Sequence, residues 1–288
     1  MNGPSSRQRT PDLTKTKARH IVSELTPFVV VPEMGQSRLD FSPFGLTVPM
    51  RYRIDPLRID NAQFCHQLQQ LDGRTFGPEG MPMDRWVFFD CCYMPGAIFG
   101  FGRPIESISD HAREVLGVPD DYQGLVPYSM YIAIPMANAG SWMGHNLASI
   151  SPLLPEEELK GLGTITKALG LRCFGTKVFF GATQWASRAL WVHQKFGPLA
   201  IHTAYTPAHS EAQTLTYGFD VTEAALLGAI GDPDITIERP VPDLWIQAGD
   251  IAAMVELQNR IESGESFVVP CAPERNDDGV RVPVTKID

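Results

Sequence analysis

The sequence has little charge. Lys, Arg, Asp and Glu make up 20% of its 288 residues, against about 25% in ordinary globular proteins, and none of them occurs between Tyr122 and Pro155. A run of this length is long enough to span a bilayer. However, Pro127, Pro135 and Gly140 interrupt it, and its apolar segments have only the length of strands. We therefore expect two buried strands and a turn in this window, and no membrane partner.

Positive charge is scarcer than negative charge. The chain has 24 Lys and Arg against 33 Asp and Glu, for a formal charge of -9. Binding to nucleic acid without sequence preference needs clustered Lys and Arg, so we expect no nucleic-acid partner. The one basic cluster lies within residues 1–20, which are polar and are predicted to form a flexible arm. No apolar segment of a secretory signal follows this cluster.

Cysteine is rare and is not arranged for a metal. The five cysteines are odd in number and form no CxxC pair of the zinc-binding type. We therefore expect reduced thiols, no metal site and a cytoplasmic location.

Between the two ends, strand-like and helix-like runs alternate, which predicts a single α/β domain over residues 21–265. Residues 266–288 mix Pro, Asp, Asn and Gly and are predicted to form a loose tail. Hydrophobic periodicity and cap residues predict helices at Asp60–Gly73, Asp110–Leu116, Thr164–Phe174, Ser187–Phe196 and after Asp250. Strands are expected at Leu46–Ile54, Trp86–Tyr93, Ile98–Phe101, Tyr128–Met136, Trp142–Ser151, Lys177–Ala182, Leu199–Thr206 and Thr214–Val221.

A glycine-containing loop precedes the helix that is predicted to begin at Thr164. Gly161 and Gly163 would let backbone N–H groups approach an anion, and the positive end of the helix dipole would favour that anion. The alternative is a tight turn that packs against the sheet. The loop alone does not decide between these two interpretations.

The order of elements around this loop resembles the GNAT superfamily of N-acetyltransferases. In that family a strand that ends in aliphatic-x-Pro precedes a (Gln/Arg)-x-x-Gly-x-(Gly/Ala) loop and a helix. Ile150-Ser151-Pro152 and Gly161-Leu162-Gly163 match these elements. Residues 186–198 follow the spacing of a later family helix, with Ala189, Val192, Lys195 and Gly197 in register. The resemblance covers residues 142–221 well and 46–141 loosely.

The resemblance implies a GNAT-like mixed central sheet flanked by helices, and acyl-CoA as the acyl donor. The backbone groups of Ile150 and Ser151 would bind the pantetheine arm. The pyrophosphate would lie at the loop and the first helical turn, formed by Lys160, Gly161, Gly163 and Thr164. The sequence departs from the family at Glu158, which stands at the usual Gln/Arg position and ends a run of three glutamates. A carboxylate near a pyrophosphate is repulsive.

Three residues are candidates for proton transfer. His193 stands where the family has a Tyr that protonates the leaving thiolate, and its alternative is an exposed helix histidine. His145 lies on the strand that often carries the family's base, and its alternative is a hydrogen-bonded core group. Asp90 lies in an apolar run, where a carboxylate needs a partner, so it is either a second base or part of a structural ion pair.

The sequence therefore predicts an acyltransferase that moves an acyl group from a CoA thioester to a small-molecule amine. One alternative is an enzyme of the same fold that uses a carrier-protein thioester or performs a different reaction. Another is a non-catalytic binding protein. The helix after Asp250 can pack on the sheet or form the contact of a homodimer, and the sequence leaves both open.

Overall fold

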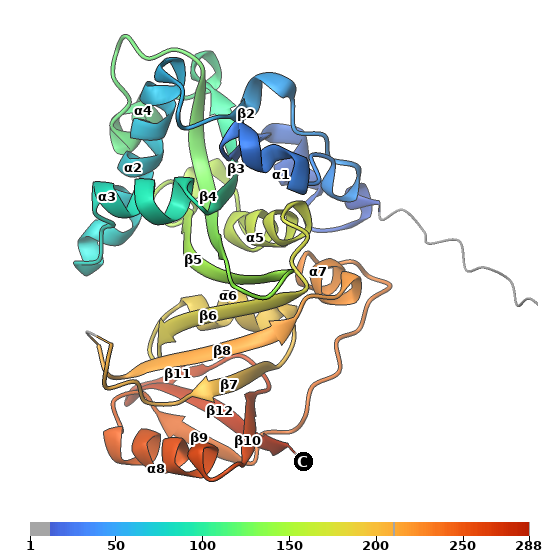
Figure 1. Cartoon of the computed structure of the whole chain (residues 1–288), viewed down its shortest axis with the longest axis vertical. Helices are drawn as coiled ribbons and strands as arrows, with labels where there is room; N and C mark the ends of the chain where they lie inside the picture. The colour runs from blue at the N-terminus through green and yellow to red at the C-terminus, as the bar shows by residue number, and fades with distance from the viewer. Residues whose placement is uncertain (1–11, 210, 288) are drawn as a thin grey trace, which may run out of the picture.

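The structure is a computed structural model that describes residues 12–209 and 211–287. Its centre is one mixed sheet of twelve strands among these residues (Figure 1). The strands are β1 (Thr26–Val30), β2 (Arg53–Ile54), β3 (Ala97–Pro104), β4 (Leu125–Pro135), β5 (Ser141–Ser149), β6 (Val178–Gln184), β7 (Leu199–Thr203), β8 (Thr214–Asp220), β9 (Leu244–Gln247), β10 (Ser266–Val269), β11 (Glu274–Asn276) and β12 (Gly279–Ile287).

The strand order is β11-β12-β10-β7-β8-β6-β5-β4-β3-β1-β2, and β9 also pairs with β12. Two of the pairs are parallel, β1 with β2 and β5 with β6, and the other pairs are antiparallel. The parallel pair of β5 and β6 lies in the middle of the sheet.

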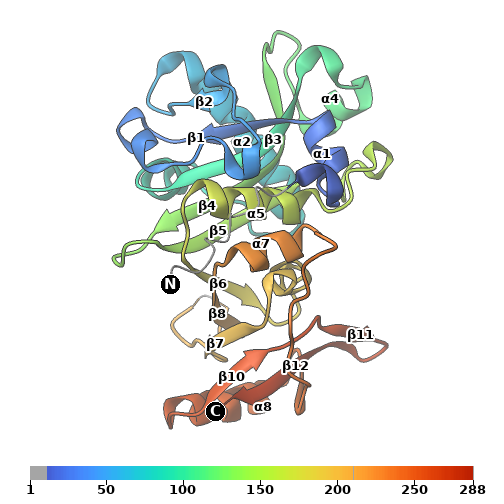
Figure 2. The same cartoon turned by 90° about the vertical axis from the view of Figure 1, so that its right-hand side faces the viewer.

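Helices cover both faces of this sheet. The α-helices are α1 (Arg19–Glu24), α2 (Ala62–Phe76), α3 (Arg85–Val87), α4 (Asp110–Leu116), α5 (Leu162–Cys173), α6 (Ala189–His193), α7 (Glu223–Ala229) and α8 (Ile251–Glu262). In Figure 1, α2, α3 and α4 lie on one side of β3–β5, and α5 lies on the opposite side. Helix α7 lies beside α5 in Figures 1 and 2. At the other end of the sheet, α8 packs through its buried Met254 and Leu257.

The charge-free window forms the expected strand pair. Strand β4 is buried from Leu125 to Ala133, and it pairs with β5 across a turn at residues 136–140. Both faces of β4 are covered, by α2 on one side and α5 on the other, so a charged side chain would have no water to reach. Within the described part of the chain, no helix is both long enough and apolar enough to cross a membrane.

The predicted strand at Trp86–Tyr93 is wrong, because this segment is helical. It consists of α3 and the π-helix η7 (Phe88–Tyr93). Phe88, Cys92 and Tyr93 are buried, and a spacing of four and five residues places them on one side of a helix. Packing of that side against the core overrides the strand preference of the aromatic residues.

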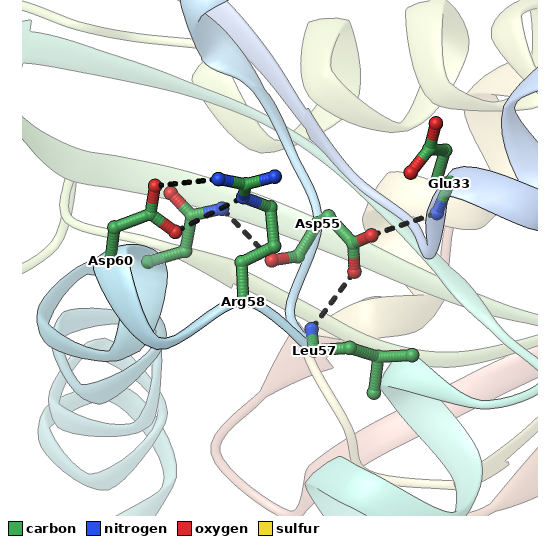
Figure 3. Close-up of polar contacts among 6 residues, drawn as sticks. Glu33, Asp55, Leu57, Arg58 and Asp60 are labelled. Carbon is green, nitrogen blue, oxygen red and sulfur yellow. Dashed lines mark hydrogen bonds and ion pairs between the residues drawn. The ribbon is translucent and has the colours of Figure 1, made fainter.

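The predicted strand at Leu46–Ile54 is also largely wrong, since only Arg53 and Ile54 pair with β1. A side chain organises the connection that follows. The carboxylate of Asp55 accepts hydrogen bonds from the backbone N–H groups of Glu33 at 3.1 Å and Leu57 at 2.9 Å (Figure 3). Asp55 thereby ties the loop before α2 to the chain that leaves β1.

The two predicted ends differ from the structure. The tail predicted at 266–288 is not loose, because residues 266–269 and 279–287 are strands of the sheet and Phe267, Val282 and Val284 are buried. The first eleven residues of the predicted arm lie outside the described part of the chain. The rest of that arm packs on the protein, since Leu13 and Ala18 are buried.

Candidate active site

The central strands β5 and β6 separate soon after they meet. They pair at Ser141–Met143 with Val178–Phe180, and no pairing between them follows. Beyond this point β5 continues to Ser149 along β4, and β6 continues to Gln184 along β8. The side chains from Met143 to Leu147 are partly or fully exposed although β5 lies in the middle of the sheet. The separation therefore leaves an opening in the sheet, where one edge of β5 is free of sheet pairing and its side chains reach solvent.

A β-bulge distorts β5 beside this opening. Tyr131 of β4 faces Leu147, and Ala133 faces Gly144. One residue of β4, Ile132, thus lies opposite two of β5, which makes His145 and Asn146 the bulged positions. A bulge re-aims side chains, and here it brings two neighbouring side chains of a strand within hydrogen-bond distance of each other.

His145 belongs to a chain of hydrogen bonds that reaches α2. His145 Nδ1 lies 3.3 Å from Asn146 Oδ1, and Asn146 Nδ2 donates to Asp72 Oδ1 at 2.8 Å. The other oxygen of Asp72 accepts the backbone N–H of Met83 at 2.6 Å. Asn146 and Asp72, which follow His145 in this series of hydrogen bonds, were not predicted from the sequence as site residues.

The surroundings of His145 keep its ring neutral near pH 7. Burial lowers its pKa, while the hydrogen bond to Asn146 and the charge of Asp72 act in the opposite direction. A neutral imidazole has one nitrogen with a free lone pair, so it can accept a proton from an attacking amine.

The predicted glycine loop forms the N-terminus of α5. Gly161 is the N-cap with φ of +91°, in the left-handed region that favours glycine, and no side chain caps the helix there. Gly163 faces β5, since a Cβ at this position would lie 3.6 Å from the Cβ of Ser149. The open end of the helix therefore lies beside the end of β5.

Lys195 contacts this helix end, and the charges of two further lysines act on it. Lys195 donates through Nζ to Thr164 Oγ1 at 3.1 Å, and Thr164 lies in the first turn of α5. The pKa of Lys195 is lowered by burial and by the charges of Lys17 and Lys160. Lysine charges that repel one another favour an anion near them, and the helix dipole adds to that preference. Of these three, Lys17 and Lys195 were not predicted as site residues.

Two of the three glutamates before the loop are engaged elsewhere. Glu157 forms an ion pair with Arg103 at 2.7 Å, and Glu156 lies 3.3 Å from His111. Glu158 is exposed with φ of +53°. Arg103 therefore neutralises one of the three carboxylates, and the repulsion that the sequence predicted for an anion at the loop remains for Glu156 and Glu158.

His193 is more enclosed than a surface histidine. Tyr217 is hydrogen-bonded to its Nδ1, and burial together with the charge of Lys167 lowers the pKa of His193 well below its usual value. Burial likewise raises the pKa of Tyr217. Both groups are therefore neutral near pH 7, which disfavours the predicted role of His193 as an imidazolium acid. A neutral imidazole can still donate one hydrogen bond.

Lys167 of α5 is fully buried next to His193. Its Nζ has no hydrogen-bond partner and lies 3.6 Å from the ring centre of Phe179, with the rings of Phe196 and Phe219 at 4.9 and 5.2 Å. Burial lowers the pKa of Lys167 well below its usual value. Cation–π contacts compensate a charge only in part, so this amine is a costly group in the core.

We expect Lys167→Met to stabilise the fold, because methionine fills the space without a polar group. Thermal unfolding at pH 7 should shift upward by roughly 2–6 °C, which corresponds to about 1–2 kcal/mol in a chain of this size. The folded-state pKa is below the unfolded one, so the penalty is present at low pH and disappears as pH rises toward 10.5. A difference in melting temperature that did not shrink between pH 7 and pH 10.5 would contradict this account.

The other predicted residues do not contribute as expected. Asp90 lies exposed on η7, so it is not the buried base that the strand prediction implied. Both backbone groups of Ile150 are already used, since its N–H donates to Tyr128 and its carbonyl accepts from Leu153 and Leu154. The N–H of Ser151 donates to the Ser149 hydroxyl at 3.3 Å. Among the described residues, no group of three or more His, Cys, Asp or Glu is placed to hold a metal.

Neither protein-family models nor curated protein sequences match the chain. Among solved structures it is similar to an aminoglycoside 6'-acetyltransferase type Ii, with 14% identity and a TM-score of 0.37 over 57% of this chain and 93% of that one. It is also similar to the ribosomal-protein-S18-alanine N-acetyltransferase from Escherichia coli, with 11% identity and a TM-score of 0.37 over 58% and 91% of the two chains. Because this likeness is distant, we base the function on the residues of this chain.

The order of elements is the one that the sequence motifs predict. Strand β5, the glycine loop, α5, β6, the short helix α6 and the strands β7 and β8 follow one another along the chain. The described residues therefore form a mixed sheet flanked by helices, as expected, and this sheet continues through β10 and β12.

Proposed function

We propose that the protein is an N-acyltransferase that moves an acyl group from a CoA thioester to an amine. The observation that carries this proposal is the separation of β5 and β6 directly beside the open N-terminus of α5. A CoA thioester needs an anion site for its phosphates and a strand edge along which its extended pantetheine arm can bind. The N-terminus of α5 and the unpaired edge of β5 are suited to these two needs and lie next to each other.

The three lysines at α5 are suited to the pyrophosphate of the donor. Lys17, Lys160 and Lys195 supply charge, and the N–H groups of Gly163 and Thr164 supply hydrogen bonds. The edge of β5 beyond Met143 supplies backbone groups for the amides of the pantetheine arm, in place of Ile150. Thr164 orients Lys195 at this site.

His145 is suited to the base of the reaction. As the amine nitrogen bonds to the thioester carbonyl carbon, its proton passes to the imidazole, and the C–S bond breaks to release a thiolate that is then protonated. His193 is our candidate for a hydrogen-bond donor to the developing thiolate. It would act as a neutral ring, with Tyr217 donating to its Nδ1.

The acceptor that we propose is a small-molecule amine. The chain carries a formal charge of -9, which favours the approach of a cationic acceptor. A protein-bound amine is the alternative within the same reaction class, and competition between free amines and peptides as acceptors separates the two.

A carrier-protein thioester is the second candidate for the donor. The exposed carboxylate of Glu158 favours it, because this charge lies beside the loop where a CoA pyrophosphate would bind. Turnover with an acylated carrier protein and none with acyl-CoA would select this donor. Absence of turnover with either would favour a non-catalytic binding protein.

We expect Gly161→Asp to weaken donor binding strongly. The new carboxylate would stand in the anion site, and repulsion of on the order of 3 kcal/mol corresponds to a loss of about 100-fold in affinity. Calorimetry with acetyl-CoA and longer acyl-CoAs measures this loss.

The matched control is Gly161→Asn, which places a side chain of the same shape at the same positive φ without charge. We expect this variant to bind within about tenfold of the wild type, since asparagine tolerates the left-handed region. Equal losses in both variants would indicate backbone strain and not an anion site. No binding of any CoA ester to the wild type would refute the CoA donor.

A further inference from the structure

Burial raises the pKa of Asp72, while its hydrogen bonds to Met83 and Asn146 lower it. With Asp72 ionised, the hydrogen bonds that link α2 to His145 can run in only one direction. An ionised carboxylate accepts hydrogen bonds and cannot donate them. Asp72 uses one oxygen for the N–H of Met83 and the other for the side chain of Asn146. Asn146 must therefore present its NH2 group to Asp72, and its oxygen is left to face His145.

This orientation determines the tautomer of His145. Asn146 Oδ1 is an acceptor, and it lies 3.3 Å from His145 Nδ1. The hydrogen bond exists only if Nδ1 carries the proton. The lone pair of the neutral ring is then on Nε2, the nitrogen that takes no part in the chain.

We propose that Asp72 is a positioning residue, which acts through Asn146 to hold His145 in the Nδ1–H tautomer and so keeps Nε2 free as the proton acceptor. This inference rests on the proposed function, because it assigns the base of that reaction. Asp72 does not touch the substrate in this scheme, and its effect reaches the reaction only through the imidazole.

Asp72 is itself held rigidly, as a positioning group must be. It is 1% exposed on the face of α2 that packs against β4 and β5. Its hydrogen bond to Met83 fixes the segment that leads into α3, so both sides of the carboxylate are tied to backbone or to the bulge. The bulge is necessary too, since neighbouring residues of a regular strand point to opposite faces.

The charge of Asp72 should also be visible in the titration of His145. Among the described residues, Asp72 is the charged group that acts on this ring, and it raises the pKa of His145 against the effect of burial. Removing the charge should lower the pKa of His145 further. A residue with a purely structural role would not produce this shift.

The experiment is nitrogen NMR of the imidazole rings in the full chain. His145 is assigned by its absence from the spectrum of His145→Ala, and the tautomer is read from the two ring nitrogens at pH 7.5. The variants are Asp72→Asn and Asn146→Ala. Asp84→Asn is the matched control, because it removes an exposed carboxylate near α3 whose side chain makes no cap hydrogen bond.

We expect the wild type and Asp84→Asn to show a protonated Nδ1 and an unprotonated Nε2 on His145. Both test variants should show mixed tautomers, and Asp72→Asn should also titrate at lower pH. Their kcat should fall about 10- to 100-fold with unchanged acyl-CoA affinity. Restoring the amide with Asn146→Gln should recover part of the kcat.

A proton on Nε2 of His145 in the wild type would overturn the inference. Unchanged tautomer and titration in the variants would overturn it as well, and Asn146→Ala decides the question if Asp72→Asn does not fold. The NMR readout needs no turnover. If neither the wild type nor any variant uses a thioester, the proposed function is refuted. The NMR spectrum still decides whether Asp72 sets the tautomer of His145.

Discussion

His145→Ala should lower kcat by about 10²- to 10⁴-fold, the usual contribution of a positioned base. The affinity for acyl-CoA should stay near the wild-type value, because the lysines at α5 and not His145 form the proposed anion site. Steady-state kinetics together with calorimetry separates the two quantities. His145→Gln is the control for size and polarity, since it keeps a polar group at the bulge but cannot accept the proton.

The pH profile gives a second test of the same residue. The base is active only when it is unprotonated, so kcat should fall as pH drops through the pKa of His145. Burial lowers that pKa below its usual value, so the wild type should keep most of its rate at pH 6.5. The kcat of His145→Ala should not show this fall at low pH. A variant within threefold of the wild-type rate would remove His145 from the mechanism.

Removing residues 266–288 should prevent the chain from folding into its native sheet. The deletion takes away β10 and β12 and exposes the outer edge of β7. It also removes several apolar side chains that are nearly inaccessible, and burial is worth about 2 kcal/mol for each: Phe267, Val269, Val282 and Val284. The total approaches the whole stability of a typical domain, roughly 5–15 kcal/mol.

Far-UV circular dichroism and size-exclusion chromatography of the truncated chain measure this effect. We expect aggregation or loss of the cooperative unfolding transition, because an unpaired edge such as that of β7 promotes association. The substitution Arg275→Ala is a control, since it alters the exposed surface of β11 and leaves the buried valines in place. A truncated chain that unfolds cooperatively at the wild-type temperature would restore the interpretation of this segment as a loose tail.

Elements with local signals were predicted well from the sequence. The helix at Asp110–Leu116 has the predicted bounds, and Asp250 caps α8 as expected, with its carboxylate 3.0 Å from the N–H of Ala253. The uncharged window was correctly divided into two strands. Caps, turns and periodicity are properties of neighbouring residues, so the sequence carries them directly.

Two segments were misread because their partners are distant in the chain. The run at Trp86–Tyr93 has the composition of a strand, but its buried side chains pack as a helix. The segment after 266 looks polar and irregular, yet it pairs with β7 of the central sheet. The composition of a segment reflects that segment alone. It does not show which strand or core surface elsewhere in the chain the segment will pack against.

Signals for the missed site residues exist in the sequence but are weak. Asp72 follows Leu68 by four residues, on the apolar face of α2, where a carboxylate must have a partner. Lys167 interrupts a helix that is otherwise buried around most of its surface. Each of these residues is a charged group among apolar ones. The sequence does not show which group either of them contacts in the folded protein.

The sequence by itself determined the order of elements, the glycine end of α5 and the absence of charge in the central strands, because these follow from local chemistry. Only the tertiary structure decided where β5 and β6 separate and that Glu157 pairs with Arg103 away from the loop. It alone placed the bulge at His145 and Asn146 opposite Asp72. These features depend on strand register and on contacts between residues as many as 74 positions apart, which a pattern of neighbouring residues does not encode.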